Sequence, residues 1–229
     1  MKRTYWAAGT AVALALLFAV AATVATASGG GHDAGAVART PALNSADAGF
    51  ARDMAVHHQQ AVEMSFIVRD RAQDEAVRGL AYDIANTQAN QRGMLLGWLD
   101  LWGLPKVVAG VPPMSWMGTA DSTSHGGHGE HTGHDMGGVT AKPGALMPGM
   151  ATKEELTALG AASGRDAEVL YLQLMTDHHK GGVAMAQGCA AQCRAPAERA
   201  LAQGMVEAQQ SELTLMADLL RQRGSAPRG

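Results

Sequence analysis

The chain has few aromatic residues and very little cysteine. Among its 229 residues, aromatic side chains make up 4% and cysteine occurs twice. Two cysteines exclude a disulfide-dense scaffold and a four-cysteine zinc site. Because aromatics are scarce, the 47% apolar share consists mostly of Ala, Leu, Val and Met. That composition favours helices over an aromatic-rich sheet.

The chain also lacks an excess of positive charge and, beyond its first 27 residues, a long apolar run. It carries 18 Lys and Arg against 21 Asp and Glu, for a formal net charge of −3. Nucleic-acid binding requires a basic face, so no nucleic-acid partner is expected. A membrane-spanning helix needs about 20 apolar residues, and no segment after residue 27 approaches that length.

The first 27 residues have the features of an export signal. Lys2 and Arg3 precede an uncharged apolar run, and Ala25-Thr-Ala27 offers a small-x-small cleavage motif. Residues 1–27 are therefore predicted to be a signal peptide, or an uncleaved membrane anchor formed by residues 7–27. Either form directs the chain to the periplasm, the cell envelope or the extracellular space, and only this segment would touch a membrane. Residues 28–43 are interpreted as a flexible stalk, and residues 225–229 as a tail.

An internal repeat organises most of the remaining chain. A constant offset of 121 residues aligns the following pairs: Phe50 with Tyr171, Met54 with Met175, His57 with His178, His58 with His179, Met64 with Met185, Gln88 with Gln209, and Gly103 with Gly224. A coincidental similarity would not keep its register over more than 50 residues. The chain therefore contains two copies of one unit, at residues 50–103 and 171–224.

Each copy is predicted to form two helices. Apolar residues and His recur every three or four positions from Phe50 to Val68 and again from Leu80 to Trp102, as on one face of a helix. Pro196 marks the start of the last helix. Two hairpins that each have one apolar face bury those faces against each other. The sequence thus predicts an all-α four-helix bundle over residues 44–224.

The segment between the copies, residues 104–150, has a different composition. Its ten Gly and five Pro predict a flexible linker without a packed element. Just after this segment, Thr152 and Glu155 have the spacing of a capping box, which predicts a short extra helix before the second copy. The linker also contains a tract rich in metal-binding side chains, and we interpret this tract as a secondary metal-capture segment: His125, His128, His131, His134 and Met136. A solvated linker that binds metal weakly is the alternative.

The chain contains 13 Met and 9 His, and the repeat places eight of these residues at matched positions. Residues at i, i+3 and i+4 share one helix face, so these side chains should converge if the two first helices face each other. Imidazole suits Cu, Zn and Ni, whereas thioether is soft and selects Cu(I). Copper is therefore the expected ion, with zinc or nickel less favoured. The predicted metal ligands are Met54, His57, His58, Met64, Met175, His178, His179 and Met185.

Other interpretations of these residues remain open. Met at helical spacing is often core filler. Four imidazoles in one core, however, are costly unless each is hydrogen-bonded or metal-bound. Gln88 and Gln209 lie on inward stripes and could orient the imidazole rings. Cys189 and Cys193 occur only in the second copy and form either a disulfide, as export favours, or a pair of thiolate ligands for Cu(I).

No enzyme signature accompanies these features. A di-iron carboxylate bundle needs inward Glu residues and Glu-x-x-His motifs, and neither copy has such a motif. A nucleophile elbow, a phosphate loop and a zinc-protease helix are also missing from the sequence. The chain is therefore predicted not to be an enzyme, and a metal-dependent oxidase is the weakest alternative.

The repeated motif resembles a known family. Met54-Ala-Val-His57-His58 and Met175-Thr-Asp-His178-His179, together with the downstream Gln residues and Met147-Pro-Gly-Met150, are similar to the domain of unknown function family number 305, which includes the CopM-type periplasmic copper-binding proteins. The resemblance covers roughly residues 45–224. It implies a ferritin-like helical bundle, an envelope location and, for some members, copper binding through His and Met. The His-Gly linker and the two cysteines depart from the family pattern.

These observations predict an exported copper-binding protein that sequesters or delivers copper at the cell envelope, with envelope metal-handling proteins as further partners. The competing hypothesis is a structural or partner-binding envelope bundle in which His and Met only pack the core.

Overall fold

The computed structural model describes residues 40–120 and 141–228. Within these residues the protein is all-α and contains no strand, as predicted. None of the described helices is long and apolar enough to cross a membrane. The elements are α1 (Ala46–Arg71), α2 (Glu75–Leu101), the 3-10 helix η1 (Ser115–Ala120), α3 (Lys153–Ala161), α4 (Gly164–Gln192) and α5 (Pro196–Gln222).

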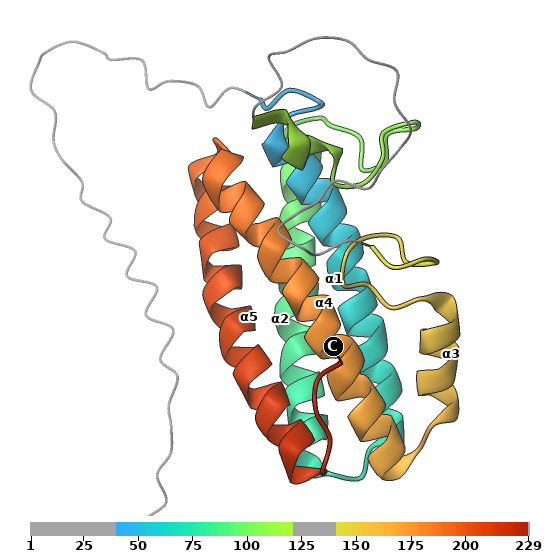
Figure 1. The fold of residues 1–229 in the computed structure, drawn as a ribbon. Helices are drawn as coiled ribbons and strands as arrows, with labels where there is room; N and C mark the ends of the chain where they lie inside the picture. Colours follow the sequence, from blue (N-terminus) through green and yellow to red (C-terminus); the bar gives the residue numbers. More distant parts are fainter. Residues whose placement is uncertain (1–39, 121–140, 229) are drawn as a thin grey trace, which may run out of the picture. The chain divides into compact units, whose positions relative to one another are not determined.

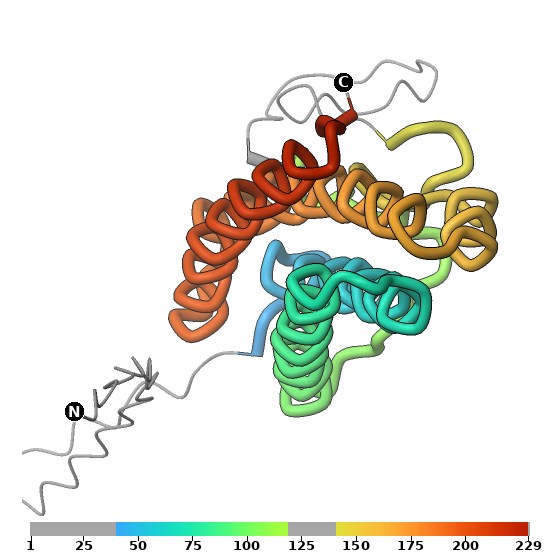
Figure 2. The backbone as a smooth tube through the Cα atoms, turned by 90° about the horizontal axis from the view of Figure 1, so that it is seen from below, coloured from blue at the N-terminus to red at the C-terminus, as the bar shows by residue number. Residues whose placement is uncertain are grey.

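The four long helices form the predicted bundle of two hairpins (Figure 1). Helices α1 and α2 make one antiparallel hairpin, and α4 and α5 make the other. Figure 2 shows the two hairpins as two layers. The layers meet where α1 of one hairpin packs against α4 of the other. Since α1 and α4 are the first helices of the two repeat copies, the bundle brings equivalent faces of the duplicated unit together.

Side-chain caps explain why the helices begin where they do. The Ser45 hydroxyl accepts a hydrogen bond from the backbone N–H of Ala48 at the start of α1. At the start of α3, Thr152 and Glu155 form both hydrogen bonds of the predicted capping box. Pro196 occupies the first turn of α5, where its missing N–H removes no helical hydrogen bond.

Two acidic residues join the hairpins at opposite ends of the bundle. Asp47 on α1 accepts hydrogen bonds from the N–H groups of Arg194 and Ala195, in the turn between α4 and α5. Glu168 on α4 accepts from the N–H groups of Gln73 and Asp74, in the turn between α1 and α2. The two residues are 121 positions apart, so the repeat relates them. Each hairpin thus caps the turn of the other.

The interior consists of two apolar clusters. One contains the second half of α1 and the first half of α4, including Met64 and Met175. The other contains the opposite halves of the same helices, including Met54 and Met185. Both clusters also draw residues from α2 and α5. The positions of α1 and α4 that lie between the clusters are occupied by the histidines.

The described parts of residues 104–150 differ from the predicted unpacked linker. Trp116 in η1 is buried, packs edge-on against Phe50 and donates its indole N–H to Asp53. Met147 and Met150 are also buried in the core. Gly and Pro prevent a long helix in this segment, but they do not prevent its large apolar side chains from anchoring it to the bundle.

Candidate metal centre

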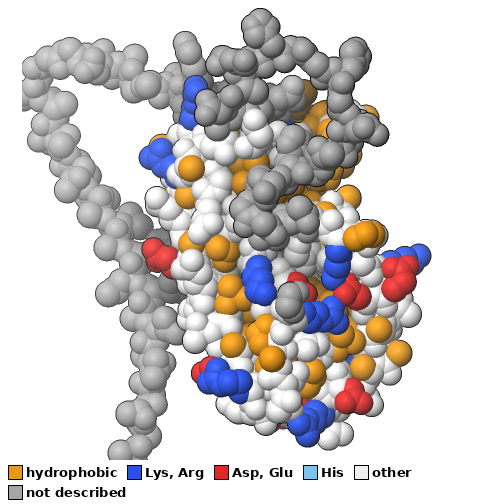
Figure 3. Space-filling view, in the orientation of Figure 1, with side chains coloured by type: hydrophobic (Ala, Val, Ile, Leu, Met, Phe, Trp, Pro, Cys, Tyr) orange, Lys and Arg blue, Asp and Glu red, His pale blue; other side chains and the backbone are white. Residues whose placement is uncertain are grey.

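Four histidines lie at the contact between α1 and α4, and all four side chains are inaccessible to solvent: His57, His58, His178 and His179. The rings of His57 and His178 face each other, with centroids 3.7 Å apart. His178 Nε2 donates to the backbone oxygen of His57 at 3.0 Å. The structure therefore brings together the four imidazoles that the repeat aligns. None of the described histidines shows on the face drawn in Figure 3.

Polar residues of α2 and α5 complete a layer around the imidazoles. His179 Nε2 lies 2.7 Å from a carboxylate oxygen of Glu212 on α5. On the other side, His58 faces the amides of Gln91 and Gln88 on α2. Gln209 occupies the space beside Gly182, where a Cβ atom would collide with its amide. The two halves of the layer thus differ, because an amide stands in one half where a carboxylate stands in the other.

Most ring nitrogens in this layer lack a hydrogen bond of ordinary geometry among the described residues. Both nitrogens of His57 and of His58, and Nδ1 of His178 and of His179, are buried without a hydrogen bond of ordinary geometry. The nearest polar groups are the Pro148 carbonyl beside His57 and the amides of Gln88 and Gln91 beside His58. Buried polar atoms are normally paired, because an unpaired group loses its hydration without compensation. Because a neutral imidazole has one N–H and one lone-pair nitrogen, each of the four rings can offer one donor nitrogen to a ligand.

Burial also keeps the rings of His57, His58 and His178 neutral. It lowers the pKa of His57 to about 3, and the neighbouring His58 and His179 contribute in the same direction. Burial likewise lowers the pKa of His58 to about 3. The pKa of His178 falls well below its ordinary value for the same reason, with His57 as the next cause. A neutral imidazole keeps the nitrogen lone pair that a metal ion requires.

The four predicted methionine ligands are fully buried but do not form one group. Met54 and Met185 belong to the apolar cluster on one side of the histidine layer. Met64 and Met175 belong to the cluster on the other side. This pairing follows from the antiparallel contact of α1 and α4, which brings the start of one motif beside the end of the other. Thioethers therefore flank the imidazoles from both directions.

The donors of this layer are imidazoles, with thioethers on both sides. Structural zinc takes four protein ligands in tetrahedral geometry. Over residues 40–120 and 141–228, no three donor atoms of the histidine layer lie within 4.8 Å of one another. Imidazoles flanked by thioethers are the donors that Cu(I) prefers. Binding of one ion by three of these rings would require the rings to move from their present tilted arrangement.

A backbone segment that the sequence did not assign to the site lies against the histidines. Gly149 and Gly181 let the Met147–Met150 segment approach α4 so closely that a Cβ on either glycine would meet backbone of the other element. Gly149 also has a φ of +80°, which glycine adopts readily. The Pro148 carbonyl lies near the His57 ring and opposes the lowering of its pKa. The sequence contains Gly149 and Gly181, but no periodic pattern in it predicts that the two glycines lie against each other.

The histidine-rich tract lies outside the described residues. This holds for His125, His128, His131, His134 and Met136, for His32 in the stalk, and for the predicted signal segment. Their predicted roles in metal capture and export stay predictions.

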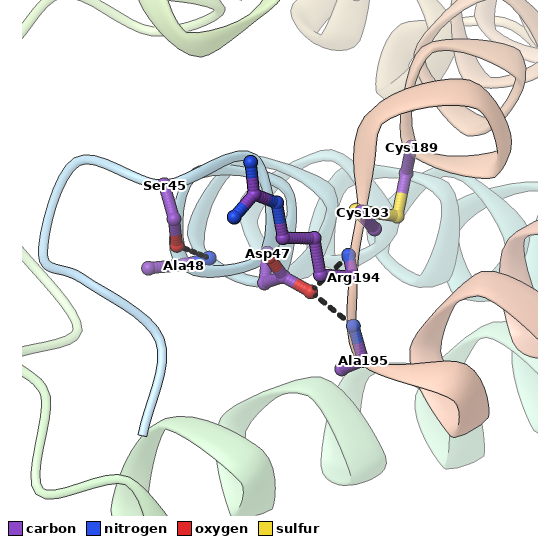
Figure 4. The surroundings of a disulfide bond; sticks show 7 residues. All are labelled: Ser45, Asp47, Ala48, Cys189, Cys193, Arg194 and Ala195. Atoms are coloured by element: carbon purple, nitrogen blue, oxygen red, sulfur yellow. Dashed lines mark hydrogen bonds between the residues drawn. A yellow bond between two sulfur atoms is a disulfide. The ribbon is translucent and has the colours of Figure 1, made fainter. Parts of the chain in front are cut away.

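Cys189 and Cys193 are joined in a disulfide at the end of α4 (Figure 4). Glu198, in the first turn of α5, is completely buried near this bond. Burial, together with the nearby Asp47, raises the pKa of Glu198 to about 9. The sequence alone does not distinguish this carboxyl group, because its position in the first turn of a helix is typical of an ordinary capping residue.

Three solved structures share this fold. A DUF305 protein from Streptomyces coelicolor, assigned as secreted, is 57% identical, with a TM-score of 0.69 over 82% of this chain and 99% of that chain. A DUF305 fragment from Deinococcus radiodurans is 27% identical, with a TM-score of 0.59 over 80% and 99% of the two chains. CopM in its Cu(I)-bound form is 19% identical, with a TM-score of 0.52 over 77% and 96%. At that identity the CopM comparison supports the fold alone.

No curated protein matches the chain significantly. The sequence profile described as "Domain of unknown function (DUF305)" matches residues 47–220. That range begins at Asp47 and ends at Leu220, so it contains both hairpins, the histidine layer and the connection between them. The chain therefore belongs to the DUF305 family.

Proposed function

We propose that this protein is an exported copper-binding protein that sequesters or delivers copper at the cell envelope. The observation that carries the proposal is the buried layer of four imidazoles, with six ring nitrogens that lack a hydrogen bond of ordinary geometry. A core evolved only for packing would gain from replacing such rings with apolar residues, since each unpaired polar atom destabilises the fold. When a cation is bound, coordination bonds to the ring nitrogens offset this destabilisation.

The surrounding residues support copper over other ions. Two pairs of buried thioethers flank the layer, and thioether is a soft ligand that selects Cu(I). The Glu212 carboxylate beside His179 adds a negative charge that a cation would balance. In the proposed mechanism the ion is bound by imidazoles of the layer, drawn from His57, His58, His178 and His179. Thioethers from one flanking pair, Met54 with Met185 or Met64 with Met175, complete its coordination. The ion is cargo, and no catalytic step is assigned to the protein.

The comparisons support the same proposal. CopM, which shares the fold, has been solved with Cu(I) and with Cu(II). The S. coelicolor relative is assigned as secreted, which agrees with the export signal predicted from residues 1–27. Zinc or nickel is the less favoured cargo. Envelope metal-handling proteins are the expected donors or acceptors of the ion.

The test is a Cu(I) titration of the disulfide-intact protein against a chromophoric chelator. The four tract histidines are first replaced by Ser, because deleting all of residues 104–150 would also remove the packed Trp116 and Met147. In this background, His57→Gln with His178→Gln should abolish tight copper uptake and the rise in Tm that copper causes. The exposed Gln59→Ala serves as the control. If the double variant is less stable but takes up copper as before, the histidines only pack the core and the competing hypothesis holds.

A further inference from the structure

The turn between α4 and α5 holds a second group of potential metal ligands, at a distance from the histidine layer along the helices. Cys189 Sγ, Cys193 Sγ and a carboxylate oxygen of Glu198 all lie within 4.8 Å of one another. All three residues are buried, with Glu198 and Cys189 at 0% exposure and Cys193 at 3%. Met185 and Met205 belong to the same apolar cluster as the cysteines, so the group is shielded from water.

Glu198 lacks the partner that its position in the helix would normally provide. It is the third residue of α5, where a Glu side chain usually accepts a hydrogen bond from the N–H of the residue that caps the helix. That N–H belongs to Ala195 and is already donated to Asp47 at 2.7 Å (Figure 4). Both carboxyl oxygens of Glu198 are buried without a hydrogen bond of ordinary geometry, and the carboxyl group of Asp47 is a polar neighbour. The carboxyl group therefore makes no capping hydrogen bond, and one of its oxygens lies within 4.8 Å of both sulfur atoms.

The state of the two sulfur atoms decides what this group can bind. In the disulfide, neither sulfur is a thiolate. A dithiol reductant that transfers two electrons and two protons converts the bond into two thiols, while the reductant itself becomes a disulfide. The thiols then lie one helical turn apart at the end of α4, and each loses its proton when it binds a metal ion. Two thiolates and one carboxylate are suitable ligands for a thiophilic cation.

We propose that Cys189, Cys193 and Glu198 form a second, redox-controlled metal site that binds a thiophilic d10 ion, Cu(I) or Zn(II), only when the two cysteines are reduced. Oxidation by a disulfide reagent removes two electrons from the thiolates, forms the Cys189–Cys193 bond and releases the ion. The site goes beyond the proposed copper centre and does not depend on it, because no residue is shared between the two.

The experiment compares the full-length protein in two redox states. One sample keeps its disulfide. The other is reduced with a dithiol, which is then removed by gel filtration without oxygen. Each is titrated with Zn(II) alone and with Cu(I) alone. The reduced protein should bind one ion more than the oxidised protein, with a new thiolate-to-metal absorption band. An oxidised dithiol should then release that ion.

This difference isolates the new site, since the histidine layer and residues 125–136 are present in both samples. The ion for which the extra binding is observed identifies the cargo. A lack of binding by the oxidised protein would count against the proposed function only. Equal uptake by both samples would overturn the redox-controlled site.

A variant tests the carboxylate separately. Glu198→Gln keeps nearly the same volume and should weaken the extra ion by at least about tenfold, since even an indirect partner of a metal ligand contributes about that much. The exposed Glu63→Gln on α1 is the matched control and should leave the affinity unchanged. Unchanged affinity in Glu198→Gln would show that the two sulfurs act alone, which contradicts a three-residue site.

Discussion

Asp47 and Glu168 make the same pair of hydrogen bonds in opposite halves of the molecule. Each accepts from two successive backbone N–H groups in the turn of the other hairpin, at 2.7–2.8 Å for Asp47 and 3.0–3.1 Å for Glu168. Glu168 is also paired with the buried Arg223 at 2.9 Å. These contacts fix how the hairpins are docked, and thereby hold the histidine layer between them.

Removing these carboxylates should destabilise the bundle unequally. Asp47→Ala leaves the turn N–H groups of Arg194 and Ala195 without their acceptor, and the free energy of unfolding should fall by about 1–2 kcal/mol. Glu168→Ala should cost more, about 3 kcal/mol, because it also leaves the buried Arg223 guanidinium without this partner. Urea unfolding monitored by circular dichroism measures both. Asp47→Asn keeps an acceptor and should fall between wild type and Asp47→Ala; an equal loss in the two Asp47 variants would contradict capping.

The difference between Glu212 and Gln91 should be reflected in copper affinity. The Glu212 carboxylate lies 2.7 Å from His179 Nε2, whereas His58 faces the neutral Gln91. If the proposed copper centre is correct, Glu212→Gln should weaken the bound ion by about 10–100-fold, the usual effect of removing a carboxylate that supports a ligand histidine.

Competitive Cu(I) titration is the measurement. The exposed Glu207→Gln, on the same helix, is the control for a lost negative charge. The reverse change, Gln91→Glu, should strengthen binding. Equal affinities for wild type and Glu212→Gln would exclude a role for the carboxylate in holding the metal.

The metal-free protein should lose stability in mild acid. The pKa of His57 and of His58 is lowered to about 3 by burial, so between pH 6.5 and 3 the unfolded chain binds protons that the folded chain does not. As the pH is lowered through this range, the free energy of unfolding therefore decreases by up to about 1.4 kcal/mol per pH unit for each residue. Urea unfolding at pH 6.5, 5.5 and 4.5 should show this slope.

Glu198 changes the pH dependence of the free energy of unfolding in the opposite direction to the two histidines. Its pKa of about 9 means that the folded protein holds a proton which the unfolded chain releases above pH 4.5, so its contribution to stability is lost as the pH rises toward 9. In Glu198→Gln the acid loss should become steeper and the alkaline loss should disappear. A pH-independent free energy of unfolding in both proteins would show that neither buried group titrates as described.

Two helical glycines should respond to alanine in opposite ways. A Cβ on Gly181 would collide with the Pro148 carbonyl, so Gly181→Ala should cost about 1–3 kcal/mol, as overpacking does. A Cβ on Gly204 in α5 meets nothing within 4 Å, and Gly204→Ala should stabilise the helix by up to about 1 kcal/mol. Thermal unfolding of the two variants measures the contrast. A neutral Gly181→Ala would mean that the Pro148 segment yields easily.

The duplicated architecture could be predicted from the sequence because it depends on local periodicity and a constant register. The offset that aligns His57 with His178 predicts that their side chains converge if the two first helices face each other, and the structure has these helices in contact. The packing of Trp116 and Met147 could not be predicted in this way. Their segment has no regular period, and their burial depends on apolar surface that exists only after the bundle has formed.

Within the site, the internal repeat identifies the four histidines from the sequence alone. Nothing in the sequence identifies Glu198 in the same way. A buried carboxyl in a first helical turn has the same sequence signature as an exposed capping residue. What distinguishes it is the contact of Asp47 with Ala195, which joins residues 148 positions apart. The separation of the methionines into two pairs likewise depends on the antiparallel packing of α1 and α4, which spacing within one helix does not define.

The covalent link between the two hairpins has a consequence for the ion-binding layer. In a dimer of identical hairpins, every change in one half would appear in the other. Here the halves are encoded separately, so Gln91 can stand opposite Glu212 and a cysteine pair can occur at one end only. A cation at the pseudo-symmetric contact between His57 and His178 would therefore experience an asymmetric electrostatic potential, lower toward α5 than toward α2. A symmetric dimer could not create this difference between its two halves, because its two-fold axis makes them identical.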